Sequence, residues 1–360
     1  MNSPLLLKLR LFLLLIFLCQ LVQAQWLDFY AATDEWATLP ADGEEKDIAV
    51  GDLNRDGLED IVVVRKNPFS NPGAREDLLL MNTGSNLEDQ TAIFAPEFLS
   101  NPTDSRDVFI GDFDNDQWPD VVIANTFEDQ PRYYRNLGND TAGNWQGLKD
   151  ESTLRFPVVL PNDPLQFCAL WAGDVTGNGA PDIYFSNYNP TGGSLDVLLI
   201  NDGNGFFTDE SQTRLGSLRN SAFGTSAEIH DMDNDGDEDI VKISTLYDIF
   251  PWFSKGVFIL YNNGDGTFTN WQEIESEAPY MFTVGDFDNN GMKDVYVVDD
   301  NNDFIHMATA IMPNTSITYE EVIVPDPRAN FFGGNVKLAD LDNNGFPHIG
   351  LDDVDEDKQS

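Results

Sequence analysis

The sequence predicts an all-β protein, a β-propeller built from repeated four-stranded blades. Three observations lead to this fold class: an acidic ten-residue segment recurs along the chain, short apolar runs flank each copy, and a second turn-forming segment follows several copies. Repeats of about 40 to 50 residues or slightly more are typical of propellers, in which each repeat forms one small sheet.

The acidic segment is clearest in GDFDNDQWPD, which begins at Gly111. Its relatives are GDLNRDGLED, GDVTGNGAPD, HDMDNDGDED, GDFDNNGMKD and ADLDNNGFPH. The leading aspartates of the six copies, 54 to 62 residues apart, are Asp52, Asp112, Asp174, Asp231, Asp286 and Asp340. This regular spacing indicates one structural unit per copy.

The residues around each copy predict two β-hairpins per unit. Apolar runs precede and follow the copies of the acidic segment, for example DVFI before the second copy and DIVVV after the first. These runs are short and rich in β-branched side chains, which favours strands over helices. The acidic segment should therefore connect two strands. In segments such as VLLINDGNGFFTDES, apolar residues alternate with others on both sides of an Asn/Gly/Asp turn, which predicts a second hairpin. Two hairpins supply the four strands of one blade.

Six copies predict six blades, with seven as the alternative if one unit has diverged beyond recognition. The last unit ends after its first two strands, and QWLDFYAATDEW near the N-terminus resembles the ends of other units. We therefore expect the N-terminal strand segment to complete the last blade and close the ring. The predicted organisation is a signal peptide over 1–24, one propeller domain over 25–352 and an acidic tail over 353–360.

The N-terminus predicts export. Lys8 and Arg10 precede the apolar run LFLLLIFLCQLV, and small residues end the segment at Ala24, a pattern typical of a cleaved secretory signal peptide. A lipoprotein anchor at Cys19 is the alternative, but Leu18 stands where a small residue is expected. We expect a secreted, periplasmic or extracellular protein with no transmembrane segment.

Charge and cysteine content restrict the possible partners and cross-links. The chain has 62 acidic and 20 basic residues and a formal net charge of −42, which excludes nucleic acid as a general partner and disfavours anionic membranes. Once the leader is removed, Cys168 is the one remaining cysteine, so no intramolecular disulfide can form. Its neighbours in QFCALWAGD predict that it is buried in a strand.

The acidic segments have the composition of calcium-binding loops. In DMDNDGDED, aspartates occupy positions one, three, five and nine, and glycine occupies position six. Calcium takes about six to eight oxygen ligands, and glycine permits the sharp turn that lets a loop surround the ion. An EF-hand would need an acid at position twelve, where Lys242 stands. The other interpretation of any single loop is an Asp/Asn/Gly turn that satisfies its own backbone.

Five loops are predicted to bind calcium. Their candidate ligands are Asp52, Asn54, Asp56 and Asp60; Asp112, Asp114, Asp116 and Asp120; Asp174, Thr176, Asn178 and Asp182; Asp231, Asp233, Asp235 and Asp239; and Asp286, Asp288, Asn290 and Asp294. The third loop has two carboxylates and should bind more weakly. In the sixth, His348 replaces the last aspartate, so we expect that loop to be empty or weakly occupied.

The unit GDFDNDxxxD between strands, followed by hairpins such as LYNNGDGTFT from Leu260, resembles the FG-GAP/VCBS repeats of integrin-α-type β-propellers. The resemblance implies calcium in the loops and a propeller used for recognition or adhesion, often at the cell surface. The predicted function is a secreted calcium-binding module that recognises a protein or carbohydrate ligand. The alternative is an extracellular, calcium-dependent, polysaccharide-active enzyme.

The motifs GxSxG and HExxH are absent, and no isolated acid/base pair stands out, so we expect no catalytic activity. His230 replaces the small residue found before the other loops and should make a local hydrogen bond. The sequons at Asn139 and Asn314 are glycosylation acceptors in a eukaryotic host.

The insertion LYDIFPWFSKG is the candidate ligand platform, because it gathers Tyr247, Phe250, Trp252 and Phe253. Packing over a neighbouring blade is the alternative role of these four side chains.

Overall fold

The computed structural model describes residues 45–354, apart from 68–70, 128, 158–165, 189–193, 222, 246–250, 252–254, 277, 300–301, 325–331 and 341–344. The candidate signal peptide, the N-terminal segment expected to close the ring and the tail beyond Val354 lie outside these residues. So do the four platform candidates, Tyr247, Phe250, Trp252 and Phe253.

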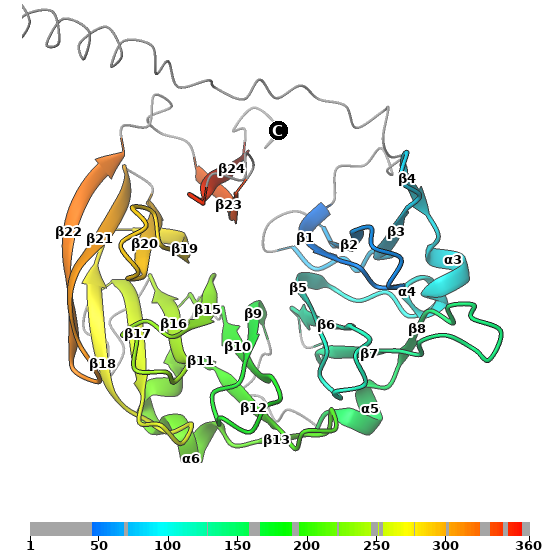
Figure 1. Ribbon diagram of the computed structural model, residues 1–360, viewed down its shortest axis with the longest axis horizontal. Coiled ribbons are helices and arrows are strands. Elements are labelled where there is room, and N and C mark those ends of the chain that lie inside the picture. The colour runs from blue at the N-terminus through cyan, green and yellow to red at the C-terminus, as the bar shows by residue number, and fades with distance from the viewer. Residues whose placement is uncertain are drawn as a thin grey trace, which may run out of the picture.

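Five four-stranded antiparallel sheets and a two-stranded sheet that follows them dominate the described residues, which confirms the all-β prediction (Figure 1). The first two strands of each sheet form a hairpin around an acidic segment, as expected. These pairs are β1 (Glu45–Gly51) and β2 (Asp60–Arg65), β5 (Ser105–Gly111) and β6 (Asp120–Asn125), β9 (Phe167–Gly173) and β10 (Asp182–Asn187), β15 (Ala227–His230) and β16 (Asp239–Ser244), β19 (Pro279–Gly285) and β20 (Asp294–Asp299), and β23 (Phe332–Ala339) and β24 (His348–Val354).

A second hairpin completes each four-stranded sheet. Its strands are β3 (Leu78–Asn82) and β4 (Leu87–Asp89), β7 (Arg132–Asn136) and β8 (Leu148–Asp150), β12 (Val197–Asn201) and β13 (Phe207–Asp209), β17 (Gly256–Asn262) and β18 (Phe268–Glu275), and β21 (Asp303–Met312) and β22 (Ser316–Val324). A small additional sheet pairs β11 (Ser194–Leu195) with β14 (Asn220–Ser221).

The sheets stand around a common centre like the blades of a propeller (Figure 1). Each first strand contacts the first strand of the next sheet, in the order β1, β5, β9, β15, β19 and β23. An ion pair also joins the last sheet to the first, because Lys337 Nζ in β23 lies 3.1 Å from Asp47 Oδ1 in β1.

Short helices follow the fourth strand of three sheets and were not expected from the sequence. They are α3 (Thr91–Phe94), α4 (Pro96–Ser100), α5 (Ser152–Arg155), α6 (Ser211–Leu215) and the 3₁₀ helix η1 (Gly216–Arg219). An Asp-x-Ser/Thr sequence starts α3, α5 and α6. Before α5, Asp150 accepts the Ser152 N–H at 2.9 Å, and the Ser152 hydroxyl accepts the Tyr133 N–H at 2.9 Å. In the described part of the chain, every helix is too short to span a bilayer.

Apolar side chains fill the spaces between adjacent sheets. One cluster joins the second and third sheets, with Val122, Phe167 and Phe185 fully buried. Cys168 in β9 is 8% exposed, as predicted. The small residue before an acidic segment allows the first strands of neighbouring sheets to pack closely. A Cβ added at Gly173 would lie 2.6 Å from Ile229 Cγ2 of the next sheet, so glycine permits the approach.

Buried asparagines at the ends of the third strands connect neighbouring sheets. Each donates its side-chain N–H to the second residue of the preceding sheet's acidic loop: Asn136 to Leu53 O (2.8 Å), Asn201 to Phe113 O (2.8 Å) and Asn262 to Val175 O (2.7 Å). The three asparagines are at most 1% exposed. The same bond therefore joins four successive sheets.

We predict that Asn201→Ala lowers the free energy of unfolding by about 1–3 kcal/mol, because it leaves buried backbone groups without partners. Urea unfolding followed by circular dichroism measures the change. Asn204→Ala in the same turn is the control, since Asn204 is exposed, and should change stability by less than about 0.5 kcal/mol. Equal effects of the two substitutions would contradict the proposed role of Asn201.

Candidate functional site

The acidic loops share one hydrogen-bonding pattern. The first aspartate of the fourth loop, Asp231, accepts the Asp235 N–H and the Gly236 N–H, both at 3.1 Å. The N–H of position six donates to the first aspartate in the other four loops as well, from Gly57, Gln117, Gly179 and Gly291. The loops therefore turn in the same way, with positions one, three and five on the inside of the turn.

Two positions of each loop have left-handed backbone conformations. Position six was predicted to need glycine, and Gly236 has φ +98°; Gln117 takes the same conformation at φ +71° without being glycine. Position four is also left-handed, and it holds an asparagine in three loops, glycine in the third and Arg55 in the first, where φ is +58°. The sequence analysis missed this second requirement.

In the five four-stranded sheets, the aspartate at position nine is the first residue of the second strand and is buried. Asp239, 1% exposed, accepts the Met232 N–H of its loop at 3.1 Å and the Asn262 N–H of the third strand at 2.8 Å. The position-nine aspartate of every four-stranded sheet accepts such a third-strand N–H; the other donors are Asn82, Asn136, Asn201 and Ala308. This residue connects the first hairpin of a sheet to the second.

Burial raises the pKa of these position-nine carboxyls. The pKa is about 6 for Asp60 and Asp182, about 7 for Asp120 and about 8 for Asp239, and that of Asp294 is raised as well. Loss of hydration is the largest cause in each case, and nearby loop aspartates add to it, whereas the backbone N–H donors act in the opposite direction.

Three loops bring three carboxylates together, with one oxygen from each within 4.8 Å of the others. These groups are Asp112, Asp114 and Asp116; Asp231, Asp233 and Asp239; and Asp286, Asp288 and Asp294. Buried oxygens without a partner among the described residues are Asp112 Oδ1, Asp114 Oδ1 and Asp233 Oδ1. Calcium prefers such oxygens, so the side chains present fit a hard divalent cation.

The first and third loops are arranged differently. Asn54 stands at position three of the first loop and donates its side-chain N–H to Asp56 Oδ2 at 3.0 Å. In the third loop, the Asn178 side chain donates to Asn201 O at 3.0 Å, and the Thr176 hydroxyl lies 3.5 Å from Asp174 Oδ1. Asp174 and Asp182 are the carboxylates of that loop.

The structure also places partners on the loops that the sequence analysis missed. Arg135 bonds Asp114 Oδ2 and Asp116 Oδ2, both at 2.9 Å, and Arg155 lies 3.2 Å from Asp114 Oδ2. On the fourth loop, the Asn314 backbone N–H donates to Asp233, and its side-chain N–H donates to Asp235 Oδ2 at 2.6 Å. Asn314 comes from the β21–β22 hairpin of the next sheet, so no local sequence pattern could reveal it.

The sixth loop is described in part. Asp340 accepts the Gly345 N–H at 2.8 Å, the bond that position six makes in the other loops. Residues 341–344 lie outside the described part of the chain, and His348 begins β24.

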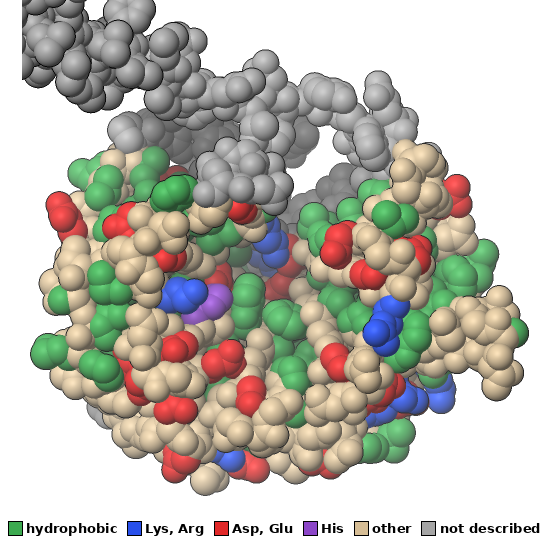
Figure 2. Space-filling view, viewed as in Figure 1, with side chains coloured by type: hydrophobic (Ala, Val, Ile, Leu, Met, Phe, Trp, Pro, Cys, Tyr) green, Lys and Arg blue, Asp and Glu red, His purple; other side chains and the backbone are tan. Residues whose placement is uncertain are grey.

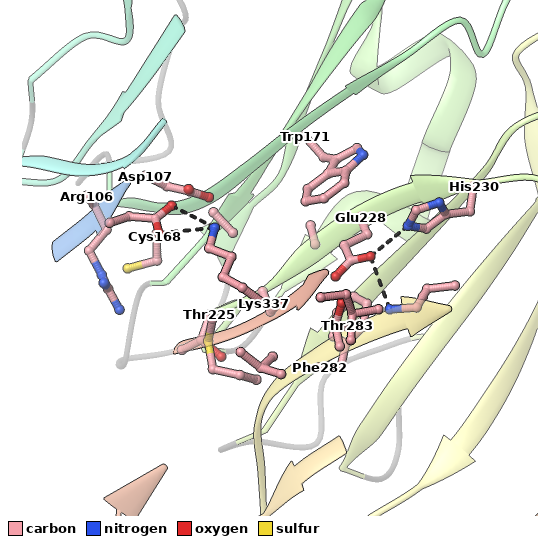
Figure 3. A pocket seen from close by; sticks show the side chains of 18 residues that line it. Arg106, Asp107, Cys168, Trp171, Thr225, Glu228, His230, Phe282, Thr283 and Lys337 are labelled. Atoms are coloured by element: carbon pink, nitrogen blue, oxygen red, sulfur yellow. Dashed lines mark hydrogen bonds and ion pairs between the residues drawn. The ribbon is translucent and has the colours of Figure 1, made fainter. Parts of the chain in front are cut away.

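A second polar site lies at the centre of the molecule, where the space-filling view shows a hollow with acidic and basic side chains (Figure 2). This central cavity has a volume of about 220 Å³ and is lined by residues of the first strands of all six sheets. Lys337 and Glu228 reach into it from β23 and β15 (Figure 3). Glu228 Oε2 lies 2.6 Å from His230 Nε2, which confirms the expected local hydrogen bond of His230.

Carboxylates in the central cavity also join neighbouring sheets. Asp107 Oδ2 accepts the Leu170 N–H at 2.7 Å, and Glu228 Oε2 accepts the Val284 N–H at 3.2 Å. Burial and the neighbouring carboxylate of Asp47 raise the pKa of Asp107 well above its ordinary value. Burial alone would lower the pKa of Lys337, but the carboxylates of Asp47 and Asp107 raise it.

The FG-GAP-like repeat family matches residues 112–185 and 174–241, which include the second, third and fourth acidic loops. The resemblance to FG-GAP repeats is therefore confirmed over this part of the chain. No curated protein is significantly similar in sequence.

Two of the solved structures with partial similarity to this chain illustrate the match. One is an Agrocybe aegerita lectin that specifically recognises non-reducing terminal N-acetylglucosamine, with 17% identity, a TM-score of 0.47, and coverage of 77% of this chain and 66% of the lectin. The other is the V. cholerae biofilm matrix protein Bap1, with 14% identity, a TM-score of 0.37, and coverage of 76% of this chain and 38% of Bap1. The chain thus matches less than two thirds of the length of either protein.

We predict that the metal-free protein loses stability as the pH rises from about 5 to about 8. The position-nine carboxyls have raised pKa values, so between about pH 4 and pH 8 the folded state holds protons that the unfolded state has released. The free energy of unfolding therefore falls with rising pH across this window.

Urea unfolding in chelator across this pH range measures the slope. Asp239→Asn should flatten it, since the amide does not titrate, whereas Glu88→Gln at an exposed position should leave it unchanged. The explanation is wrong if Asp239→Asn leaves the slope as steep as in the unsubstituted protein.

Proposed function

We propose that this chain is an exported, calcium-stabilised, six-bladed β-propeller that recognises a protein or carbohydrate ligand. One observation carries the proposal: the five fully described loops repeat the same turn, three of them gather three carboxylates each, and the second and fourth loops hold buried carboxylate oxygens without a partner among the described residues. Grouped, partly buried carboxylates repel one another unless a cation neutralises them.

The five loops would hold calcium through positions one, three, five and nine. Calcium supplies positive charge that neutralises the carboxylates, and it performs no reaction here. In the second and fourth loops, Arg135 and Asn314 bond carboxylates that calcium would also bind. We expect these two side chains to shift when calcium binds.

A closed ring of six blades is part of the proposal. Lys337 of the last sheet and Asp47 of the first form an ion pair, which brings the two sheets together at the seam. In β1, Ile48 and Val50 are 44% and 54% exposed to solvent. The N-terminal segment that resembles a blade end would add strands to β23 and β24 and cover such apolar surface.

Binding rather than catalysis is proposed for this ring. The carboxylates of the central cavity accept backbone N–H groups of the neighbouring sheet, as Asp107 does from Leu170 and Glu228 does from Val284. These bonds give the carboxylates a role in holding the sheets together, which does not require chemistry on a substrate.

Calcium should raise the thermal stability of the chelator-treated mature protein, with about five ions bound at saturation. A site at hundredfold excess of calcium over its Kd adds about 2.7 kcal/mol. Differential scanning calorimetry with metal analysis measures both quantities. Asp233→Ala should lose one ion and part of the stabilisation, whereas Glu320→Gln at an exposed position should lose neither. An unchanged melting temperature with no bound ion would refute calcium stabilisation.

Ligand recognition should depend on calcium. On arrays of glycans and extracellular proteins, we expect the calcium-loaded protein to bind a restricted set of ligands and to lose them in chelator. Trp252→Ala, at the platform predicted from sequence, should weaken capture, and Trp252→Phe should retain most of it. Turnover of a polysaccharide in a parallel activity panel would instead favour the enzymatic alternative.

A further inference from the structure

We propose that the central cavity binds one neutral pyranose ring, held by Trp171, Glu228 and Thr283. This inference rests on the proposed recognition function and assigns to it a ligand class and a location. The location differs from the platform predicted from sequence, which lies between the second and third strands of the fourth unit.

The size of the cavity suits a single sugar ring. Its volume is about 220 Å³, below the roughly 300–1,000 Å³ of pockets that enclose drug-sized ligands. Trp171, Glu228 and Thr283 come from three successive first strands, β9, β15 and β19, and surround one side of the space (Figure 3).

Three polar groups in the cavity lining have no hydrogen-bond partner among the described residues. Glu228 is 5% exposed; its Oε2 accepts bonds from His230 and the Val284 N–H, and its Oε1 accepts none. The Thr283 and Ser226 side-chain hydroxyls, in residues that are each 6% exposed, make no hydrogen bond in the described structure. These groups are open to the cavity, so the hydroxyls of a ligand can supply hydrogen bonds to them in place of water.

Trp171 supplies the apolar side of the site. The indole is partly buried and is held between Phe109, with ring centroids 5.6 Å apart, and His230, at 5.7 Å. A fixed aromatic ring beside a few well-placed polar groups is the usual composition of a small-molecule site. The C–H face of a pyranose ring can pack on the indole while its hydroxyls meet Glu228 and Thr283.

Charged side chains of the cavity lining that already interact with neighbours favour a neutral ligand over an ionic one; Arg106, for example, interacts with Cys168 and Asp107. Lys337 pairs with Asp47, and Glu228 is bonded to His230, so a charged ligand would compete with existing pairs. Hydroxyl groups can bond Glu228 Oε1 and Thr283 without breaking either pair. A neutral sugar can therefore form new hydrogen bonds in the cavity while breaking fewer existing pairs than a charged ligand would.

The test measures binding of methyl glycosides of D-glucose, D-galactose and D-mannose to the calcium-saturated mature protein, with D-glucuronate as the charged comparison. Saturation-transfer NMR detects binding, and titration calorimetry gives the Kd. We expect saturable binding of at least one neutral glycoside, weakened at least about tenfold by Trp171→Ala and by Thr283→Val. Trp271→Ala in β18 and Thr309→Val in β21 lie outside the cavity lining and should leave the Kd unchanged.

Melting temperatures identify a variant that fails to fold; Thr283→Val, which preserves side-chain shape, then decides the outcome. The inference is overturned if no neutral glycoside binds, if D-glucuronate binds more tightly, or if neither cavity variant weakens binding. A protein that is stabilised by calcium and captures array ligands, but binds no glycoside in the cavity, would keep the proposed function and lose this inference. A protein that binds a glycoside in the cavity but is not stabilised by calcium would keep this inference and lose the proposed function.

Discussion

The fold depends on a buried aspartate at the ninth position of the acidic loop in each four-stranded sheet. Asp239 accepts N–H groups from its own loop and from the third strand, and the residue that donates from the third strand, Asn262, bonds the loop of the preceding sheet. One carboxylate therefore fixes the loop, the second hairpin and, through the asparagine, the neighbouring sheet. Burying it without a cation nearby is costly, as the raised pKa of Asp239 indicates. The acidic loop and the packing of sheets are two parts of one network.

Because the units are repeats, much of the architecture could be predicted from local sequence. Hairpins around the acidic segments, the left-handed turn at Gly236 and the burial of Cys168 all follow from residues close together in the chain. Features that depend on contacts between residues distant in the chain could not be predicted. Asn314 meets the fourth loop from the next sheet, and the short helices depend on a serine or threonine that bonds a strand in the same sheet. Both need the three-dimensional arrangement.

The central cavity could not be predicted from the recurring positions of the repeats either. The residue three places before each loop aspartate lies on the first strand, and the six units place different residues there: Ala49, Phe109, Trp171, Glu228, Thr283 and Lys337. The loops repeat because each must make the same turn. The inner-strand residues vary: Trp171, Glu228, Thr283 and Lys337 line the central cavity, whereas Ala49 and Phe109 pack against the core clusters between sheets. Aligning the repeats and searching for positions that vary, instead of positions that recur, would have pointed to Glu228 and Trp171.

The ion pair between Lys337 and Asp47 has a consequence for how the molecule assembles. Its partners are 290 residues apart, and pairing them closes a very long loop, which is slow and entropically costly compared with forming a local hairpin. Each sheet can form from neighbouring residues as the chain emerges, but in the proposed closed ring the contact between the first and last sheets must wait for the last sheet. The polypeptide would thus pass through an open arc with unfinished edges, and joining the two ends would be the late, committing step of its folding.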